Sequence, residues 1–178
     1  MLELSTLGLL LGEPLHGYRL KQQLELFMGC CISVNYGAIY PLLKRLEERG
    51  EITTLATDST EATSRKTYSI TAQGRLRWRE KMLEHPHESW VNSRSRFTIK
   101  FFFFGYLEPI ERVILLEHRL KICQLRQAAL EVEVIPRDNP YASAAWQRSL
   151  DILNSEVQWL GEQLAKEASH QITINENV

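Results

Sequence analysis

The stretch from Ser33 to Gly50 constrains the fold more than any other part of the chain, because its apolar residues repeat at helical spacing. Four of them follow the i, i+3, i+4, i+7 rule and would form one apolar stripe: Ile39, Leu42, Leu43 and Leu46. The other side of the predicted helix carries Gly37, Pro41 and Lys44, and Tyr40 and Arg45 lie on its flanks. Such a helix buries one side and offers the other for contact with DNA.

Pro41 conflicts with a regular helix over this whole stretch. Proline has no backbone N–H, so inside a helix it removes a hydrogen bond and should bend or loosen the first turns. Because Pro41 lies on the face of the predicted helix opposite the apolar stripe, we keep the helix prediction.

The residues before this stretch predict two more helices. Leu4 to Leu11 has leucines on one side and ends at Gly12-Glu13-Pro14, and a second segment runs from His16 to Met28 before Gly29. Two helices, a short connection and a third helix with an apolar inner stripe form a helix-turn-helix.

The residues after Gly50 predict a β-hairpin and a fourth helix. Ile52–Thr57 and Arg65–Ile70 are rich in strand-forming residues and are separated by a polar turn, and Thr71 can cap a helix that continues to Leu83. A helix-turn-helix followed by a hairpin is a winged helix. We therefore predict a mainly α fold with a small β-hairpin, in which residues 1–86 form a winged-helix domain.

Residues 87–178 predict a separate helical domain. A polar stretch at 87–95 is interpreted as a hinge, Phe97–Phe104 as a short helix, and the break at Pro136 to Pro140 as a turn between two long helices. Both long helices carry coiled-coil-like seams, and we predict that their seam residues serve dimerisation: Val113, Leu116, Leu120, Trp146, Leu150, Leu153, Val157, Leu160 and Leu164. The seams can alternatively pack the two helices of one chain on each other. Further apolar residues off the seams favour a second copy.

The charge distribution and the lack of targeting signals limit the classes of function that the chain can have. The net charge is −1, but residues 1–105 carry 14 Lys and Arg against 11 Asp and Glu, whereas residues 106–178 carry 7 against 11. The excess of positive charge in the first part is small. The sequence shows no signal peptide, and its longest apolar cluster, Phe101–Phe104, is far too short to span a membrane. We expect a cytoplasmic protein without a membrane partner.

Neither cysteines nor histidines form a recognisable reactive site. Cys30, Cys31 and Cys123 lack paired CxxC spacing, and the five histidines lack HExxH spacing. The chain also lacks a nucleophile elbow and a glycine-rich phosphate loop. We therefore expect no metal, no cofactor and no enzymatic activity. Oxidation of Cys30 or Cys31 could disturb the helix that follows, although free cysteines usually serve as small buried apolar residues.

The chain resembles the PadR family of winged-helix transcriptional regulators, in particular the branch with a long two-helix C-terminal region. The matching residues are His16-Gly17-Tyr18, the run from Gly37 to Glu47, Gly50, Arg65-Lys66, Tyr68, Ile70-Thr71 and Gly74. The resemblance is specific over residues 1 to 85 and general over 90 to 170. It implies a homodimer that binds operator DNA and regulates transcription, often as a repressor, and the family tolerates proline at the position of Pro41.

Three positions depart from the family pattern. Glu51 replaces an apolar residue, the wing tip carries Asp58 and Glu61, and Thr67 stands where an aromatic residue is frequent. An acidic wing tip weakens the case for deep insertion into the minor groove.

The predicted DNA contacts lie in two places. One is the first two turns of the helix predicted within Ser33–Gly50, which we call the reading helix, and the other is the base of the wing, the hairpin that follows it. The N-terminal part of a reading helix reaches base edges, whereas lysines and arginines neutralise phosphates. The predicted DNA-binding residues are Tyr18, Arg19, Asn35, Tyr36, Gly37, Tyr40, Lys44, Arg65 and Lys66. Alternatively, Tyr18 and Tyr68 are core aromatics with a hydrated hydroxyl.

One alternative to DNA binding and one addition to it remain open. The winged helix could be a protein-interaction module without DNA binding, which an exposed apolar patch on the reading helix would favour. Separately, a small-molecule inducer could bind among Trp90, Trp146, Trp159 and Phe101–Phe104, although the same aromatic residues could simply build the dimer core.

Overall fold

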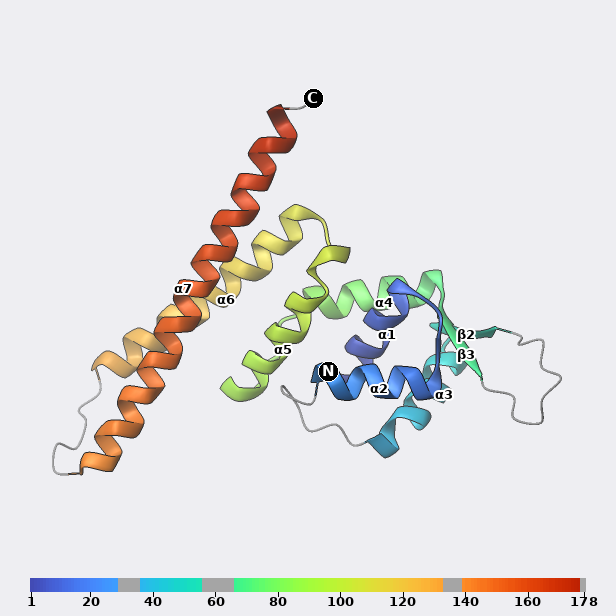
Figure 1. Cartoon of the computed structure of the whole chain (residues 1–178), viewed down its shortest axis with the longest axis horizontal. Coiled ribbons are helices and arrows are strands. Elements are labelled where there is room, and N and C mark those ends of the chain that lie inside the picture. The colour runs from blue at the N-terminus through green and yellow to red at the C-terminus, as the bar shows by residue number, and fades with distance from the viewer. Residues whose placement is uncertain (29–35, 56–65, 133–138, 177–178) are drawn as a thin grey trace. The chain divides into compact units, whose positions relative to one another are not determined.

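The computed structural model describes residues 1–28, 36–55, 66–132 and 139–176, and it is mainly helical with one small sheet (Figure 1). Residues Met1–Gly105 form one compact unit and residues Tyr106–Val178 form another. The first unit extends beyond residue 86, where the sequence placed the boundary, because helix α5 (Trp90–Phe102) belongs to it. Phe103, which directly follows α5, packs edge-on against Trp78 at a centroid distance of 6.3 Å.

The first unit is a winged helix, as the sequence predicted. Its helices are α1 (Leu2–Gly12), α2 (Gly17–Met28), α3 (Ile39–Glu48), α4 (Ala72–Leu83) and α5, with the 3-10 turn η1 (Tyr36–Ala38) before α3. A second 3-10 turn, η2 (Phe104–Tyr106), spans the boundary between the two units. Strands β1 (Leu15–His16), β2 (Ile52–Leu55) and β3 (Thr67–Ile70) form an antiparallel sheet in the order β1-β3-β2. The predicted hairpin is β2 and β3. Strand β1 was not predicted, because two residues are too few to show alternation.

Helix α3 begins later than predicted, and this removes the conflict at Pro41. The 3-10 turn η1 precedes the helix, which starts at Ile39 and makes Pro41 its third residue. N–H groups in the first turn of a helix have no intrahelical acceptor, so a proline there removes no hydrogen bond. The expected loosening of the helix around Pro41 is therefore wrong.

The core of the first unit contains the stripe that the sequence predicted for α3. All four stripe residues are buried, and they are joined by leucines from α1 and α2. The buried residues of these three helices include Leu4, Leu7, Leu10, Leu20, Leu24, Ile39, Leu42, Leu43 and Leu46. Burial of this apolar surface stabilises α3 on the helices behind it and leaves its other side to solvent.

Side-chain caps fix where α4 and α5 begin. The Thr71 hydroxyl accepts a hydrogen bond from the Gly74 N–H at 3.1 Å, which confirms the predicted cap of α4. Ser89 caps α5 in the same way, accepting from Asn92 N–H at 3.4 Å. Residues 90–95 are therefore helical, and the predicted hinge over 87–95 is wrong for most of its length.

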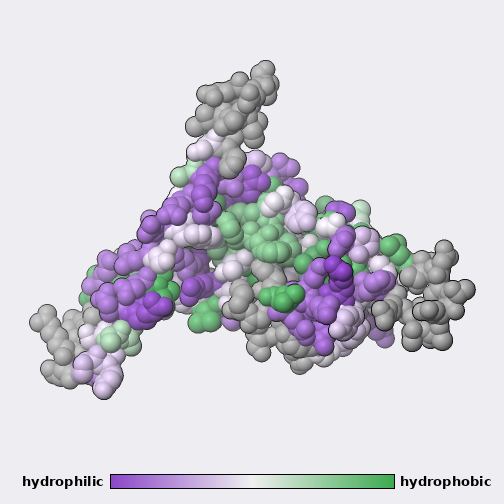
Figure 2. Space-filling model, viewed as in Figure 1, coloured by the Kyte–Doolittle hydropathy of each residue, from purple (hydrophilic) through white to green (hydrophobic). Residues whose placement is uncertain are grey.

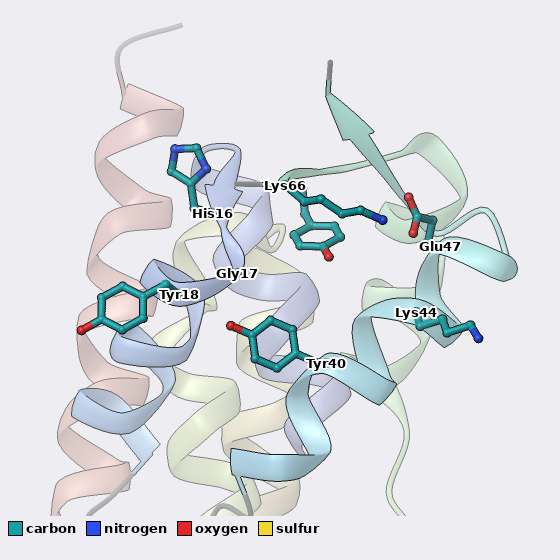
Figure 3. A pocket seen from close by; sticks show the side chains of 8 residues that line it. His16, Gly17, Tyr18, Tyr40, Lys44, Glu47 and Lys66 are labelled. Carbon is teal, nitrogen blue, oxygen red and sulfur yellow. The ribbon is translucent and has the colours of Figure 1, made fainter. Parts of the chain in front are cut away.

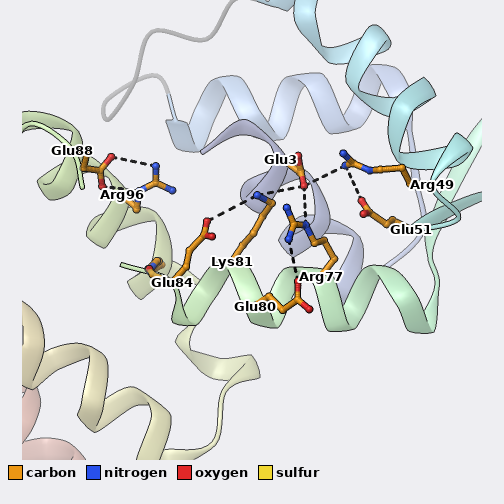
Figure 4. A network of polar contacts seen from close by, with 10 residues as sticks. Glu3, Arg49, Glu51, Arg77, Glu80, Lys81, Glu84, Glu88 and Arg96 are labelled. Carbon is orange, nitrogen blue, oxygen red and sulfur yellow. Dashed lines mark hydrogen bonds and ion pairs between the residues drawn. The ribbon is translucent and has the colours of Figure 1, made fainter. Parts of the chain in front are cut away.

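A single carboxylate ties the end of α3 to α1 and α4 (Figure 4). Glu3 Oε1 lies 3.3 Å from an Arg49 nitrogen, 3.5 Å from Arg77 Nε and 3.5 Å from Lys81 Nζ. Burial raises the pKa of Glu3, but Lys81, Arg49 and Arg77 outweigh this effect and hold the pKa below its usual value. Glu51, which departs from the family pattern, is buried and pairs with Arg49 at 2.9 Å.

The second unit is an antiparallel helical hairpin of α6 (Pro109–Val132) and α7 (Pro140–Glu176). Polar pairs join the two helices along their length: Arg112–Glu167 at 3.0 Å, Arg119–Glu156 at 2.5 Å and Gln127–Asn154 at 2.7 Å. Figure 2 shows mainly hydrophilic residues on the visible surface of the hairpin. Within the described residues, no helix has the length and apolarity that a membrane crossing requires.

Candidate nucleic-acid interface

An open groove with a volume of about 850 Å³ lies on the outward side of α3 (Figure 3). Residues from β1, α2, α3 and the β3 region line it: His16, Gly17, Tyr18, Tyr40, Lys44, Glu47, Lys66 and Tyr68. Tyr40 and Lys44 come from the first two turns of α3, on the side opposite the buried stripe. The buried stripe thus determines which residues of α3 face the groove.

Gly17 permits the close approach of α2 to the aromatic floor of the groove. A Cβ at this position would lie 3.3 Å from a Tyr40 ring carbon and 3.5 Å from a Tyr68 ring carbon. The ring of Tyr68 is buried, while Tyr40 is 55% exposed. The lack of a side chain at Gly17 therefore sets the spacing between the N-terminus of α2 and α3.

The groove contains both positive and negative groups. The Lys44 side chain is 78% exposed and lies 3.8 Å from Glu48, an exposed pairing that contributes little to stability. Glu47 is held by the Thr54 hydroxyl at 2.5 Å, and the Lys66 side chain extends toward it in Figure 3. Burial raises the pKa of the Tyr68 hydroxyl, and the neighbouring Glu47 and Tyr40 raise it further. Tyr68 therefore presents a neutral hydroxyl to the groove.

The groove brings together four of the nine residues predicted to bind DNA: Tyr18, Tyr40, Lys44 and Lys66. Arg19 is exposed on α2 but does not line the groove, and Gly37 is exposed in η1. The backbone of Tyr36 also lies in η1. Asn35 and Arg65 lie outside the described residues.

Sequence reasoning missed four lining residues, which are His16, Gly17, Glu47 and Tyr68. His16 and Gly17 belong to the His-Gly-Tyr motif, which the resemblance had already singled out. Glu47 lies one turn after Lys44, and this spacing was the signal that could have placed it beside the other groove residues.

The predicted dimerisation residues divide between buried and half-buried positions in the isolated chain. Leu116, Leu153 and Leu160 are buried, whereas the other six are half-buried. The more exposed apolar side chains of α6 are different ones, and they include Ile110, Ile114, Ile122 and Leu125. Burial within one chain, the alternative that the sequence left open, therefore accounts for three of the nine seam residues, and the prediction that the seams serve dimerisation stays a prediction.

Two sequence comparisons decide the family. Residues 6–80 match the model of the transcriptional regulator PadR-like family. The negative transcriptional regulator PadR of Bacillus subtilis (strain 168) is 30% identical over 131 residues, which cover 73% of this chain and 69% of the relative. The chain belongs to the PadR-like family. Since the family consists of transcriptional regulators, the expectation that the chain is not an enzyme is confirmed.

Three solved structures align with nearly the whole chain. B. subtilis PadR in complex with operator DNA has a TM-score of 0.47 and 24% identity, covering 93% of this chain and 98% of its own. The same protein with p-coumaric acid has a TM-score of 0.43 and 23% identity, covering 94% and 95%. The Vibrio cholerae virulence activator AphA has a TM-score of 0.42 and 19% identity, covering 96% and 99%. Family membership itself rests on the sequence matches.

Proposed function

We propose that this PadR-like protein represses transcription by binding a near-palindromic operator as a homodimer. The observation that carries the proposal is the groove on the outward side of α3, where Tyr40 and Lys44 are exposed beside Tyr18 and Lys66. In winged helices the third helix enters the major groove, and exposed lysines beside it neutralise phosphates. The relative named as a negative regulator supports repression.

The exposed side of α3 favours DNA over a protein partner. The exposed residues of α3 include Tyr40, Pro41, Lys44, Arg45 and Glu48, which form no continuous apolar patch. A protein-interaction module would bury an apolar surface at this position. In the proposed complex, Tyr40 and Gly37 contact bases, while Lys44 and Lys66 contact phosphates. Asn35, Tyr36, Arg65 and Arg19 remain proposed contacts on the basis of the sequence.

We include a small-molecule inducer in the proposal, because a related PadR structure holds p-coumaric acid. The phenylalanines that the sequence offered for such a site pack on one another: Phe101 lies 4.9 Å from Phe104 and 6.3 Å from Phe97 between ring centroids. This packing favours a structural role for them over ligand contact. Release of bound DNA by small aromatic acids, measured by fluorescence anisotropy, tests this part of the proposal.

Lys44→Ala tests the proposed interface. Fragments that the purified protein selects from a pool of genomic DNA provide the specific site. Removing one phosphate contact should weaken binding to specific and random DNA alike, and should lower the slope of log affinity against log salt by about 1. Tyr40→Phe should instead change the sequence preference. Arg75→Ala, an exposed cation of α4 outside the groove, is the matched control. If Lys44→Ala and Arg75→Ala bound like the parent, the proposed interface would be wrong.

A further inference from the structure

His16 lines the groove, but the proposed function gives it no role. It is an exposed residue of β1 and pairs with Thr67 in the β1–β3 ladder. The side chains of the two residues are also joined, because His16 Nδ1 lies 2.8 Å from Thr67 Oγ1. Figure 3 shows the imidazole at the rim of the groove, directly before the start of α2 and the outward-pointing Tyr18.

The contact with Thr67 leaves one nitrogen of His16 available for a ligand. A threonine hydroxyl can donate its proton to an unprotonated Nδ1, and a neutral imidazole then carries its own proton on Nε2. No described residue forms a hydrogen bond with His16 Nε2. The hydrogen bond also restricts rotation of the ring, so the Nε2–H group keeps a fixed direction. Thr67, which replaces the aromatic residue frequent in the family, supplies this hydroxyl.

We propose that His16 is a positioning residue for DNA, whose Nε2–H donates a hydrogen bond to a backbone phosphate and whose ring is oriented by Thr67. The inference rests on the proposed DNA-binding function. Phosphate oxygens are acceptors, and the lysines beside His16 in the groove, Lys44 and Lys66, already attract the backbone to this surface. A neutral donor adds direction to a contact that flexible lysines leave loosely defined.

Variants of His16 and Thr67, with Lys66→Ala for comparison, test the proposal with random-sequence duplex DNA at pH 8. His16→Ala should weaken binding about 3- to 10-fold, which corresponds to the net contribution of one ordinary hydrogen bond at an exposed site. The slope against salt should stay unchanged, since a neutral donor displaces no counterion, whereas Lys66→Ala should lower it by about 1. His16→Gln, which retains an N–H donor, should restore part of the affinity.

Thr67 provides the second half of the test. Thr67→Val, which removes the hydroxyl at nearly constant shape, should reproduce most of the loss, and Thr67→Ser should bind like the parent. Adding Thr67→Val to His16→Ala should cause no further loss, because both changes remove the same contact. If His16→Ala folds poorly, His16→Gln and Thr67→Ser still test the proposal, because both variants keep polar side chains at the two positions.

Four results would overturn the proposal. Parent-like affinity of His16→Ala and Thr67→Val would overturn it alone, leaving the proposed function intact. A lower salt slope for His16→Ala, or an affinity loss matched by a lower melting temperature in every His16 and Thr67 variant, would assign the pair a different role. Absence of DNA binding by the parent protein would overturn the proposed function and this inference together.

Discussion

At the scale of single residues, Gly74 shows how closely α4 packs on the sheet. A Cβ at Gly74 would lie 2.0 Å from the Glu51 carbonyl oxygen and 2.8 Å from Ile70 Cγ1. The nearest obstacle is backbone and cannot rotate away. The same glycine donates the N–H that Thr71 caps, so its position serves both the cap and the packing.

We expect Gly74→Ala to destabilise the protein by about 3 kcal/mol or more, because the backbone at Glu51 must move to accept the methyl group. The melting temperature, followed by circular dichroism, measures the effect. Gly161→Ala is the matched control: its Cβ would meet nothing within 4 Å, and alanine in mid-helix should stabilise α7 by about 0.5–1 kcal/mol. Equal melting temperatures for parent and Gly74→Ala would contradict this account.

The residues of the groove were predictable only where one helix carried them. Helical periodicity predicted Lys44 opposite the buried stripe and Tyr40 on its flank, and both residues line the groove. His16 enters the groove because β1 pairs with β3, more than fifty residues away in the chain. Local patterns carry no information about such a pairing.

At the scale of elements, α5 carries a buried cation. Lys100 is buried, and its Nζ donates a hydrogen bond to the Glu84 carbonyl oxygen at 2.6 Å. Burial, with a contribution from Arg96, lowers the pKa of Lys100 to about 8, although Glu84 and Glu88 partly oppose the shift. The ammonium is therefore disfavoured in the folded state relative to its usual pKa of 10.5.

This shift predicts a rise in stability between about pH 8 and pH 10.5. In that range the unfolded chain binds a proton that the folded chain has released, so the free energy of unfolding increases with pH. Lys100→Met should remove this rise and should stabilise the protein at pH 7 by on the order of 2 kcal/mol. Urea denaturation at pH 7 and pH 10 measures both effects. Lys44→Met, at an exposed site, should leave the pH profile unchanged, and a parent-like profile for Lys100→Met would contradict the prediction.

Element boundaries were harder to predict than element types. The apolar stripe predicted α3 correctly, but residue propensities do not reveal that the 3-10 turn η1 precedes it, which is what makes Pro41 acceptable. The polar residues near Ser89 resembled a linker, yet Ser89 is a helix cap and α5 starts directly after it. In both cases short polar or glycine-containing segments fit a turn and a helix start equally well.

At the scale of the whole molecule, α6 presents apolar side chains that its own chain leaves uncovered. Ile110, Ile114, Ile122 and Leu125 recur at helical spacing and are all substantially exposed. Isolated apolar residues on a surface are ordinary, but a row along one helix is typical of an interface. The proposed homodimer would bury this row, since the buried seam residues already pack within the hairpin.

We expect light scattering to give a dimer at micromolar concentration, and Ile114→Glu together with Ile122→Glu to give a folded monomer, because the two carboxylates would have to be desolvated in the interface. Leu76→Glu, at a site on α4 that is 66% exposed, should remain dimeric. A monomeric parent protein would rule out the homodimer. A dimeric double variant would place the interface elsewhere.

The two sides of α3 have separate roles, so residues on one side can be substituted without affecting the other. The stripe from Ile39 to Leu46 holds the helix in place and Glu3 holds Arg49 just after its end, while Tyr40 and Lys44 lie on the opposite side and bury little. Substitutions at the exposed positions therefore cost little stability. Gene duplication followed by change at a few of these sites can give a descendant a new operator without a new fold.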